Sequence, residues 1–96
     1  MQIKQLKKQD KIWECEYGLN IPLTVITDPI EKDEGFEVQC ENYITKETVF
    51  LYAKEKYEHY GPRIYEYPEY VGHHYLDLNR YSGIDIDDLI KNGWKI

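Results

Sequence analysis

The stretch KETVFLYAKEKYEHY, Lys46–Tyr60, decides between two folds for this chain. Its apolar side chains recur at the spacing of one helix face, and KEKYEH supplies a charged opposite face. The Gly61-Pro62 pair that follows is a strong helix stop, so the pattern predicts a helix over residues 46–60. The alternative is a strand over 48–52, because TVFLY is rich in β-branched and aromatic residues.

Upstream of this stretch, three segments are predicted strands: the first and third alternate apolar and polar side chains with the period of a half-buried strand, and the second is a β-branched run. They span residues 11–17, 21–27 and 35–43, and the turn between the first two falls near Asn20. Cys15 and Cys40 lie within these alternating patterns. The sequence therefore predicts two reduced core thiols, with a disulfide between neighbouring strands as the alternative.

Downstream, residues 63–67 read as a short fourth strand, and residues 68–83 as a long loop with an extended piece near 75–78. Asp85 or Ser82 begins a short helix of about residues 86–91. The expected fold is α+β: one domain over residues 1–96, with a small antiparallel sheet of three to four strands packed by one central helix and a short C-terminal helix. A small SH3-like β-barrel is the alternative if TVFLY is a strand.

Composition bounds the function. The chain has 96 residues and a formal net charge of −6, which repels nucleic-acid phosphates and favours basic partners. We therefore expect no direct nucleic-acid binding. No apolar segment follows the basic residues near the N-terminus, and no apolar run is long enough to span a membrane. A cytoplasmic location is expected. The single alanine beside abundant isoleucine, lysine and tyrosine is typical of an AT-rich bacterial or phage genome.

Tyrosine is the most unusual component of the chain. Eight of the ten tyrosines fall between Tyr52 and Tyr81, most densely in YEYPEYVGHHY, residues 65–75. A tyrosine combines a large apolar ring with one polar tip, so it suits both cores and contact surfaces. Four of these tyrosines have few apolar neighbours in the sequence. Together with the glutamates and histidines among them, they are the predicted partner-binding residues: Tyr65, Glu66, Tyr67, Glu69, Tyr70, His73, His74 and Tyr75.

Carboxylates gather in and after the early loop, where five of them form a predicted acidic patch: Glu31, Asp33, Glu34, Glu37 and Glu41. Separated pKa values in such a group can serve acid–base catalysis, but a solvated acidic surface is far commoner. Glu37 and Glu41 fall on one face of the predicted strand 35–43. We therefore expect a negative surface rather than catalytic residues.

Motifs for chemistry are sparse. His73-His74 lacks metal-ligand spacing, because neighbouring side chains of an extended segment point to opposite faces. The aspartates at 85, 87 and 88 do not match a calcium loop, and no glycine-rich phosphate loop or GxSxG motif is present. The sequence predicts no cofactor, no metal site and no catalytic residue.

These observations predict a small acidic non-enzymatic protein-binding module, an adaptor or inhibitor, that presents tyrosines and carboxylates to a basic partner surface. One version is an accessory protein of a phage or mobile element, and another is a mimic of nucleic acid. The first alternative is a small metal-dependent enzyme that uses His73, His74 and nearby acids. The second is a self-associating structural protein, in which the tyrosine surface makes a homo-oligomer.

Overall fold

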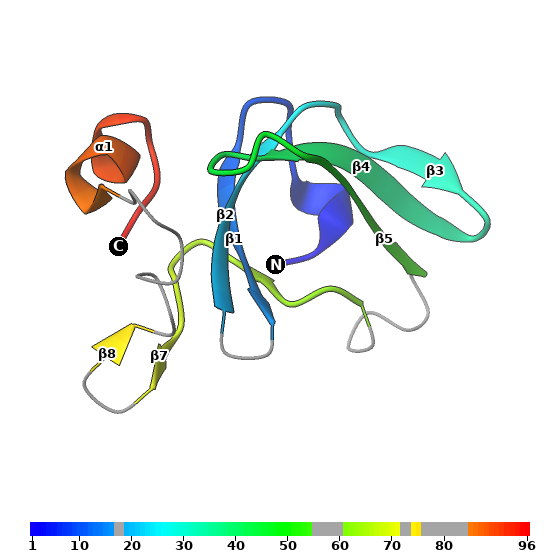
Figure 1. Cartoon of the computed structure of the whole chain (residues 1–96). Coiled ribbons are helices and arrows are strands. Elements are labelled where there is room, and N and C mark those ends of the chain that lie inside the picture. Colours follow the sequence, from blue (N-terminus) through cyan, green and yellow to red (C-terminus); the bar gives the residue numbers. More distant parts are fainter. Residues whose placement is uncertain (17–18, 55–60, 72–73, 76–84) are drawn as a thin grey trace.

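The structure, a computed structural model, describes the chain except for residues 17–18, 55–60, 72–73 and 76–84. Most of it is one antiparallel sheet that curls into a half-barrel (Figure 1). The long strands are β1 (Lys11–Glu16), β2 (Leu19–Val25), β4 (Gly35–Asn42) and β5 (Thr48–Lys54). These segments are rich in β-branched and aromatic side chains, which suit a pleated and half-buried surface.

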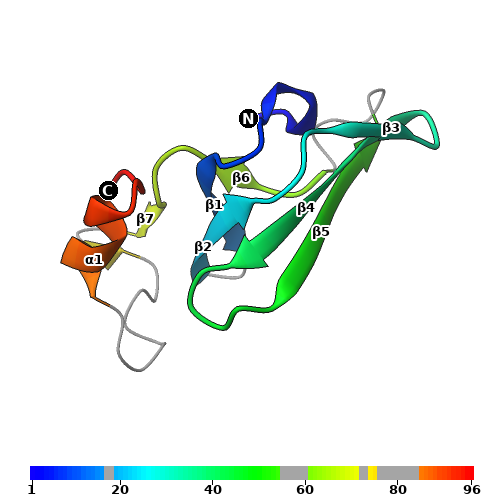
Figure 2. The same ribbon diagram turned by 90° about the horizontal axis from the view of Figure 1, so that it is seen from above.

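Strand β4 organises the sheet. Strands β2 and β3 (Ile30–Lys32) pair with one edge of β4, and β5 pairs with its other edge along the full length of β5. Beyond β2 the order continues through β1 to β6 (Ile64–Tyr65). Figure 2 shows β5 at the margin of this sheet, with β4 between it and the remaining strands.

The main core lies on the concave side of the sheet. Alternate residues of the strands point there, and the 3-10 helix η1 (Ile3–Gln5) lies against β4 and β5 on the same side. The buried members of this core are Ile3, Leu6, Ile12, Leu23, Val25, Val38, Cys40, Leu51 and Ile64. Burial of each of the larger aliphatic side chains in this core stabilises the fold by roughly 1.5–3 kcal/mol.

A second core lies on the outer face of β1. Trp13 and Cys15 point there and pack against Leu89 of helix α1 (Ile86–Lys91) and against Trp94. The Asp85 side chain caps α1 by accepting the backbone N–H groups of residues 87 and 88. A two-stranded hairpin, β7 (Tyr70–Val71) and β8 (His74–Tyr75), forms a separate small sheet. Among the described residues, no helix is long and apolar enough to cross a membrane.

The expected central helix over residues 46–60 is wrong. Residues 48–54 form β5, with Glu41 opposite Thr48 and Gly35 opposite Lys54; residues 55–60 lie outside the described part of the chain. Val49 and Ala53 share the concave face because residues four apart lie on the same side of a strand as well as of a helix. Their spacing therefore could not separate the two structures. With β5 a strand, the fold is mostly β, and the SH3-like alternative is closer than the α+β expectation.

The other expected elements differ less from the structure. The predicted strands 11–17, 21–27 and 35–43 correspond to β1, β2 and β4, and the short C-terminal helix is present with Asp85 as its cap. Asn20 lies inside β2 rather than in a turn. The expected strand over residues 63–67 is reduced to β6, and most of the expected extended piece near 75–78 lies outside the described residues.

Candidate functional site

An exposed surface covers the outer side of β3, β4 and β5. Residues opposite each other in an antiparallel pair point to the same face, and the register aligns Ile30 with Glu37 and Glu37 with Tyr52. The next row aligns residue 39 with Phe50 on that face. We call this surface the acidic–aromatic face and define it by Ile30, Glu37, Glu41, Phe50 and Tyr52.

Two large apolar side chains on this face are open to solvent. Phe50 is 61% exposed and Ile30 is 57% exposed, although both belong to strands of the main sheet. The second core does not cover them, because its residues lie over β1 and not over β3 or β5. Exposed apolar side chains that share a surface with charged neighbours are typical of contact sites between proteins.

The carboxylates of this face are Glu37 and Glu41. Glu37 forms an ion pair with Lys32, with 3.7 Å between Nζ and Oε2, and its side chain keeps 26% of its surface exposed. Glu41 lies in the ladder between Thr24 on β2 and Thr48 on β5. Both carboxylates therefore flank the row that contains Phe50, one on each side along the strand.

The structure divides the predicted acidic patch. Glu31 is opposite Phe36, which packs on the concave core, so Glu31 lies on the other side of the β3–β4 hairpin from Glu37. Asp33 and Glu34 occupy the turn, with φ angles of 47° and 64°. Only Glu37 and Glu41 of the five predicted acids share the outer face.

Tyr65 and Tyr67 of the predicted partner-binding segment lie on a different surface. Tyr65 is 37% exposed and Tyr67 is 54% exposed. Arg63 forms an ion pair with Glu69, with 2.7 Å between Nη2 and Oε1, and its Cζ lies 6.0 Å from the centre of the Tyr65 ring. We call this region the tyrosine surface and define it by Arg63, Tyr65, Glu66, Tyr67, Glu69 and Lys95.

The second half of the tyrosine surface repeats this arrangement. Lys95 forms an ion pair with Glu66, and its Nζ lies 5.8 Å from the centre of the Tyr67 ring. The hydrogen bond to Glu66 raises the pKa of Lys95. Each glutamate of the tyrosine surface therefore has a cation of the same chain beside it, and the surface is locally balanced in charge.

Asn20 holds the tyrosine surface against the sheet. This fully buried side chain donates from Nδ2 to the carbonyl of Glu69 at 3.1 Å, and its Oδ1 accepts the N–H of Glu69 at 2.9 Å. The Asn20 amide thus bonds both the N–H and the C=O of residue 69, as the backbone of a neighbouring strand would. Cys15 donates its Sγ–H to the same Oδ1 at 3.0 Å, and burial raises the pKa of this thiol. No separate signal for this role is present in the sequence, since an asparagine two residues after a glycine is typical of a turn.

The histidine segment is described in part. Tyr70 is opposite Tyr75 and Val71 is opposite His74 in the β7–β8 hairpin, whereas His73 lies outside the described residues. Within the described ranges, no group of three or more His, Cys, Asp or Glu residues could hold a metal ion. Both cysteines are buried free thiols in agreement with the sequence expectation, and burial raises the pKa of Cys40 to about 12.

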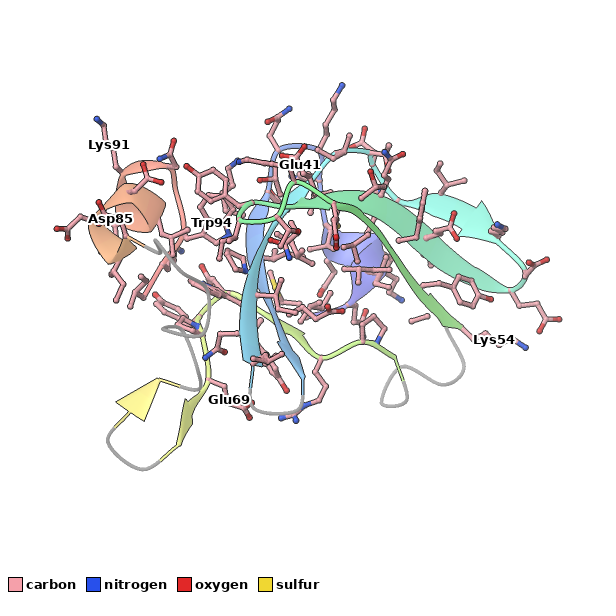
Figure 3. All side chains as sticks on the ribbon, viewed as in Figure 1. Glu41, Lys54, Glu69, Asp85, Lys91 and Trp94 are labelled. Atoms are coloured by element: carbon pink, nitrogen blue, oxygen red, sulfur yellow. The ribbon has the colours of Figure 1, made fainter. Side chains whose placement is uncertain are left out.

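The two surfaces lie apart. Figure 3 shows Glu41 toward the top of the view, next to the start of β5, and Glu69 toward the bottom, near the lower ends of β1 and β2. Sequence reasoning named Glu37 and Glu41 but missed Ile30, Phe50 and Tyr52. The strand alternative for TVFLY was the available signal, because it would have placed Phe50 and Tyr52 on the face of a strand opposite to Leu51.

The chain has no significant match among protein-family models, curated proteins or solved structures. Its function therefore has to be argued from these two surfaces.

Proposed function

We propose that this chain is a small non-enzymatic protein-binding module, an adaptor or inhibitor, whose acidic–aromatic face binds a basic partner protein. The observation that supports this most directly is the exposure of Phe50 and Ile30, at 61% and 57%, on the same sheet face as Glu37 and Glu41. An aromatic anchor with a charged rim is the usual composition of a protein contact site.

The two kinds of side chain would have different roles. Burial of Phe50 under a partner would supply affinity, since apolar area contributes roughly 25 cal/mol per Å² removed from water. The carboxylates of Glu37 and Glu41, within a chain of formal charge −6, would attract a basic partner and increase its association rate. This attraction would weaken as salt is added, because salt screens exposed charges.

The tyrosine surface is the weaker candidate for a basic partner. Glu66 and Glu69 already lie beside Lys95 and Arg63, so a partner cation would have to displace a cation of this chain. Tyr65 and Tyr67 remain available as neutral contact area. On the acidic–aromatic face, Lys32 lies beside Glu37 in the same way, but among the described residues no ion pair includes Glu41, so we assign the basic partner to this face.

Mimicry of nucleic acid is not favoured by the placement of the acids. A mimic needs carboxylates spaced along one continuous surface, in the way that phosphates are spaced along a nucleic-acid strand. Here Glu31 lies on the opposite side of the hairpin from Glu37, and Asp33 and Glu34 lie at its turn.

The cytoplasm is the compartment we propose, because the two buried cysteines are free thiols.

The test is affinity capture with the wild-type chain and two charge-reversal variants, at low and at moderate salt. Glu37→Lys/Glu41→Lys changes the acidic–aromatic face. Glu31→Lys/Glu34→Lys makes the same change in net charge elsewhere on the hairpin and is the matched control. We expect wild type and control to retain the same basic proteins, released by salt, and the first variant to lose them. Equal capture by all three chains would overturn the proposal.

A further inference from the structure

We propose that the outer edge of β5, with which no described strand pairs and which we call the free edge, binds an extended basic segment of the partner as an added antiparallel strand. This inference rests on the proposed function, because it names how the partner would approach the acidic–aromatic face. Strand addition at an exposed sheet edge is a common way for a β protein to recognise a peptide, since backbone hydrogen bonds supply affinity and side chains supply selectivity.

The backbone register shows which groups the edge offers. Asn42 donates its N–H to the carbonyl of Glu47 at 2.9 Å, and the ladder continues from there with Glu41 opposite Thr48. Because backbone hydrogen bonds alternate along an antiparallel pair, residues 49, 51 and 53 bond to β4. The N–H and C=O groups of residues 48, 50 and 52 therefore point away from β4. Among the described strands, none pairs with this edge.

This edge lacks the features that usually prevent strand addition. Natural edges are kept short, bulged, or interrupted by proline and by inward-pointing charges. β5 pairs continuously from Thr48 to Lys54, contains no proline, and carries its single charge at its last residue. Of the strands at the borders of the main sheet, β3 has three residues and β6 has two, whereas β5 has seven. Figure 2 shows β5 at the margin of the sheet, on the far side of β4 from β2.

Charge selects the occupant. Glu37 is opposite Tyr52 and Glu41 is opposite Thr48, so carboxylates lie one strand away from the two ends of the free edge. An added strand would lie about 10 Å from β4, within reach of long lysine or arginine side chains. Phe50 lies between these ends and would contact an apolar side chain. The preferred segment of five residues therefore has basic side chains at its first and fifth positions and an apolar side chain at its third. A second copy of this chain would bring another charge of −6, which disfavours self-pairing.

Two peptides test the hydrogen bonds directly. The probe is Lys-Thr-Val-Thr-Lys with capped ends, and its control carries an N-methyl group on the valine nitrogen that would face β5. We expect the N-methyl group to weaken binding about tenfold or more, the effect of losing about 1.4 kcal/mol. In the complex, hydrogen exchange at the amides of residues 48, 50 and 52 should slow. Equal affinity for both peptides, or no binding of either, would overturn the proposal.

Two variants test the edge from the side of the protein. Phe50→Pro removes an N–H that β4 does not use, whereas Phe50→Thr removes the same aromatic ring and keeps that N–H. We expect the proline variant to bind the probe about tenfold more weakly than the threonine variant, while circular dichroism shows a retained fold. If Phe50→Pro does not fold, the N-methylated peptide still decides.

The outcomes separate this inference from the proposed function. Partner capture that is lost in Glu37→Lys/Glu41→Lys but unchanged in Phe50→Pro would overturn strand addition and leave the binding face intact. Loss in neither variant would overturn both. Sedimentation velocity without peptide provides a further check. A wild-type dimer that Phe50→Pro converts to a monomer would assign the edge to a second copy of this chain and overturn the basic strand as its occupant.

Discussion

Trp13 and Trp94 each donate an indole N–H to the backbone beside the other. Trp13 Nε1 bonds to the carbonyl of Lys95 at 2.9 Å, and Trp94 Nε1 bonds to the carbonyl of Ile12 at 3.0 Å. Both rings are almost fully buried. The two bonds join residues 82 positions apart, so they attach the C-terminal segment to the first strand. That attachment also places Lys95 beside Glu66 in the tyrosine surface.

Trp94→Phe should destabilise the protein by about 1 to 3 kcal/mol, because it removes a buried hydrogen bond and leaves unfilled volume against Cys15 and Leu89. The measurement is the free energy of unfolding in urea. Tyr43→Phe is the control. Its hydroxyl donates to Asp88 at 2.7 Å at a partly buried position, so its loss should cost less. A Trp94→Phe variant as stable as wild type would show that the C-terminal segment is not held by this bond.

Asn20→Ala should loosen the tyrosine surface. The substitution removes both hydrogen bonds to the backbone of Glu69 and the acceptor of the Cys15 thiol, which we expect to cost about 1 to 3 kcal/mol. Hydrogen exchange at the amide of residue 69 should accelerate by more than at the β4–β5 amides. Uniform acceleration throughout the sheet would indicate general destabilisation and would contradict a local role for Asn20.

Glu34→Gly should stabilise the β3–β4 hairpin. Glu34 has a φ angle of 64°, in the left-handed region where a side chain is costly and glycine is not. We expect a gain of about 0.5 to 1 kcal/mol in the free energy of unfolding. Glu31→Gly makes the same change in composition inside β3, where glycine weakens a strand, and should destabilise. Equal effects of the two substitutions would show that the change of glutamate to glycine, and not the backbone conformation at residue 34, determines the change in the free energy of unfolding.

Much of the sheet could be predicted from period-two alternation, and the failure at β5 has a specific cause. β4 alternates cleanly, because one of its faces meets the main core and the other carries polar side chains. In β5 the concave positions Val49, Leu51 and Ala53 alternate with Phe50 and Tyr52, which are also apolar or aromatic. Hydrophobicity alone therefore showed no alternation there. The i, i+4 pair then favoured a helix, although a strand places it on one face equally well.

The candidate surfaces were predictable only in composition. The sequence indicated that Tyr65 and Tyr67 had few apolar neighbours, but not that Arg63 and Lys95 would lie beside Glu69 and Glu66. Lys95 is 29 residues from Glu66 along the chain, and such a contact depends on how the C-terminal segment packs. Likewise, the exposure of Phe50 depends on which strands the second core covers, and local pattern carries no information on that.

Alkaline pH should destabilise the protein through Cys40. Burial raises the pKa of this thiol from 9.0 to about 12. Above about pH 9 the unfolded chain loses the thiol proton while the folded chain keeps it, so the unfolded state binds fewer protons. Stability present below that pH is then lost as the pH rises toward 12. The free energy of unfolding should fall more between about pH 8 and about pH 11 in wild type than in Cys40→Ala. Titration of Tyr43 acts in the same direction, because its hydrogen bond to Asp88 raises its pKa, but it is common to both chains. Parallel pH profiles would contradict a buried neutral thiol at position 40.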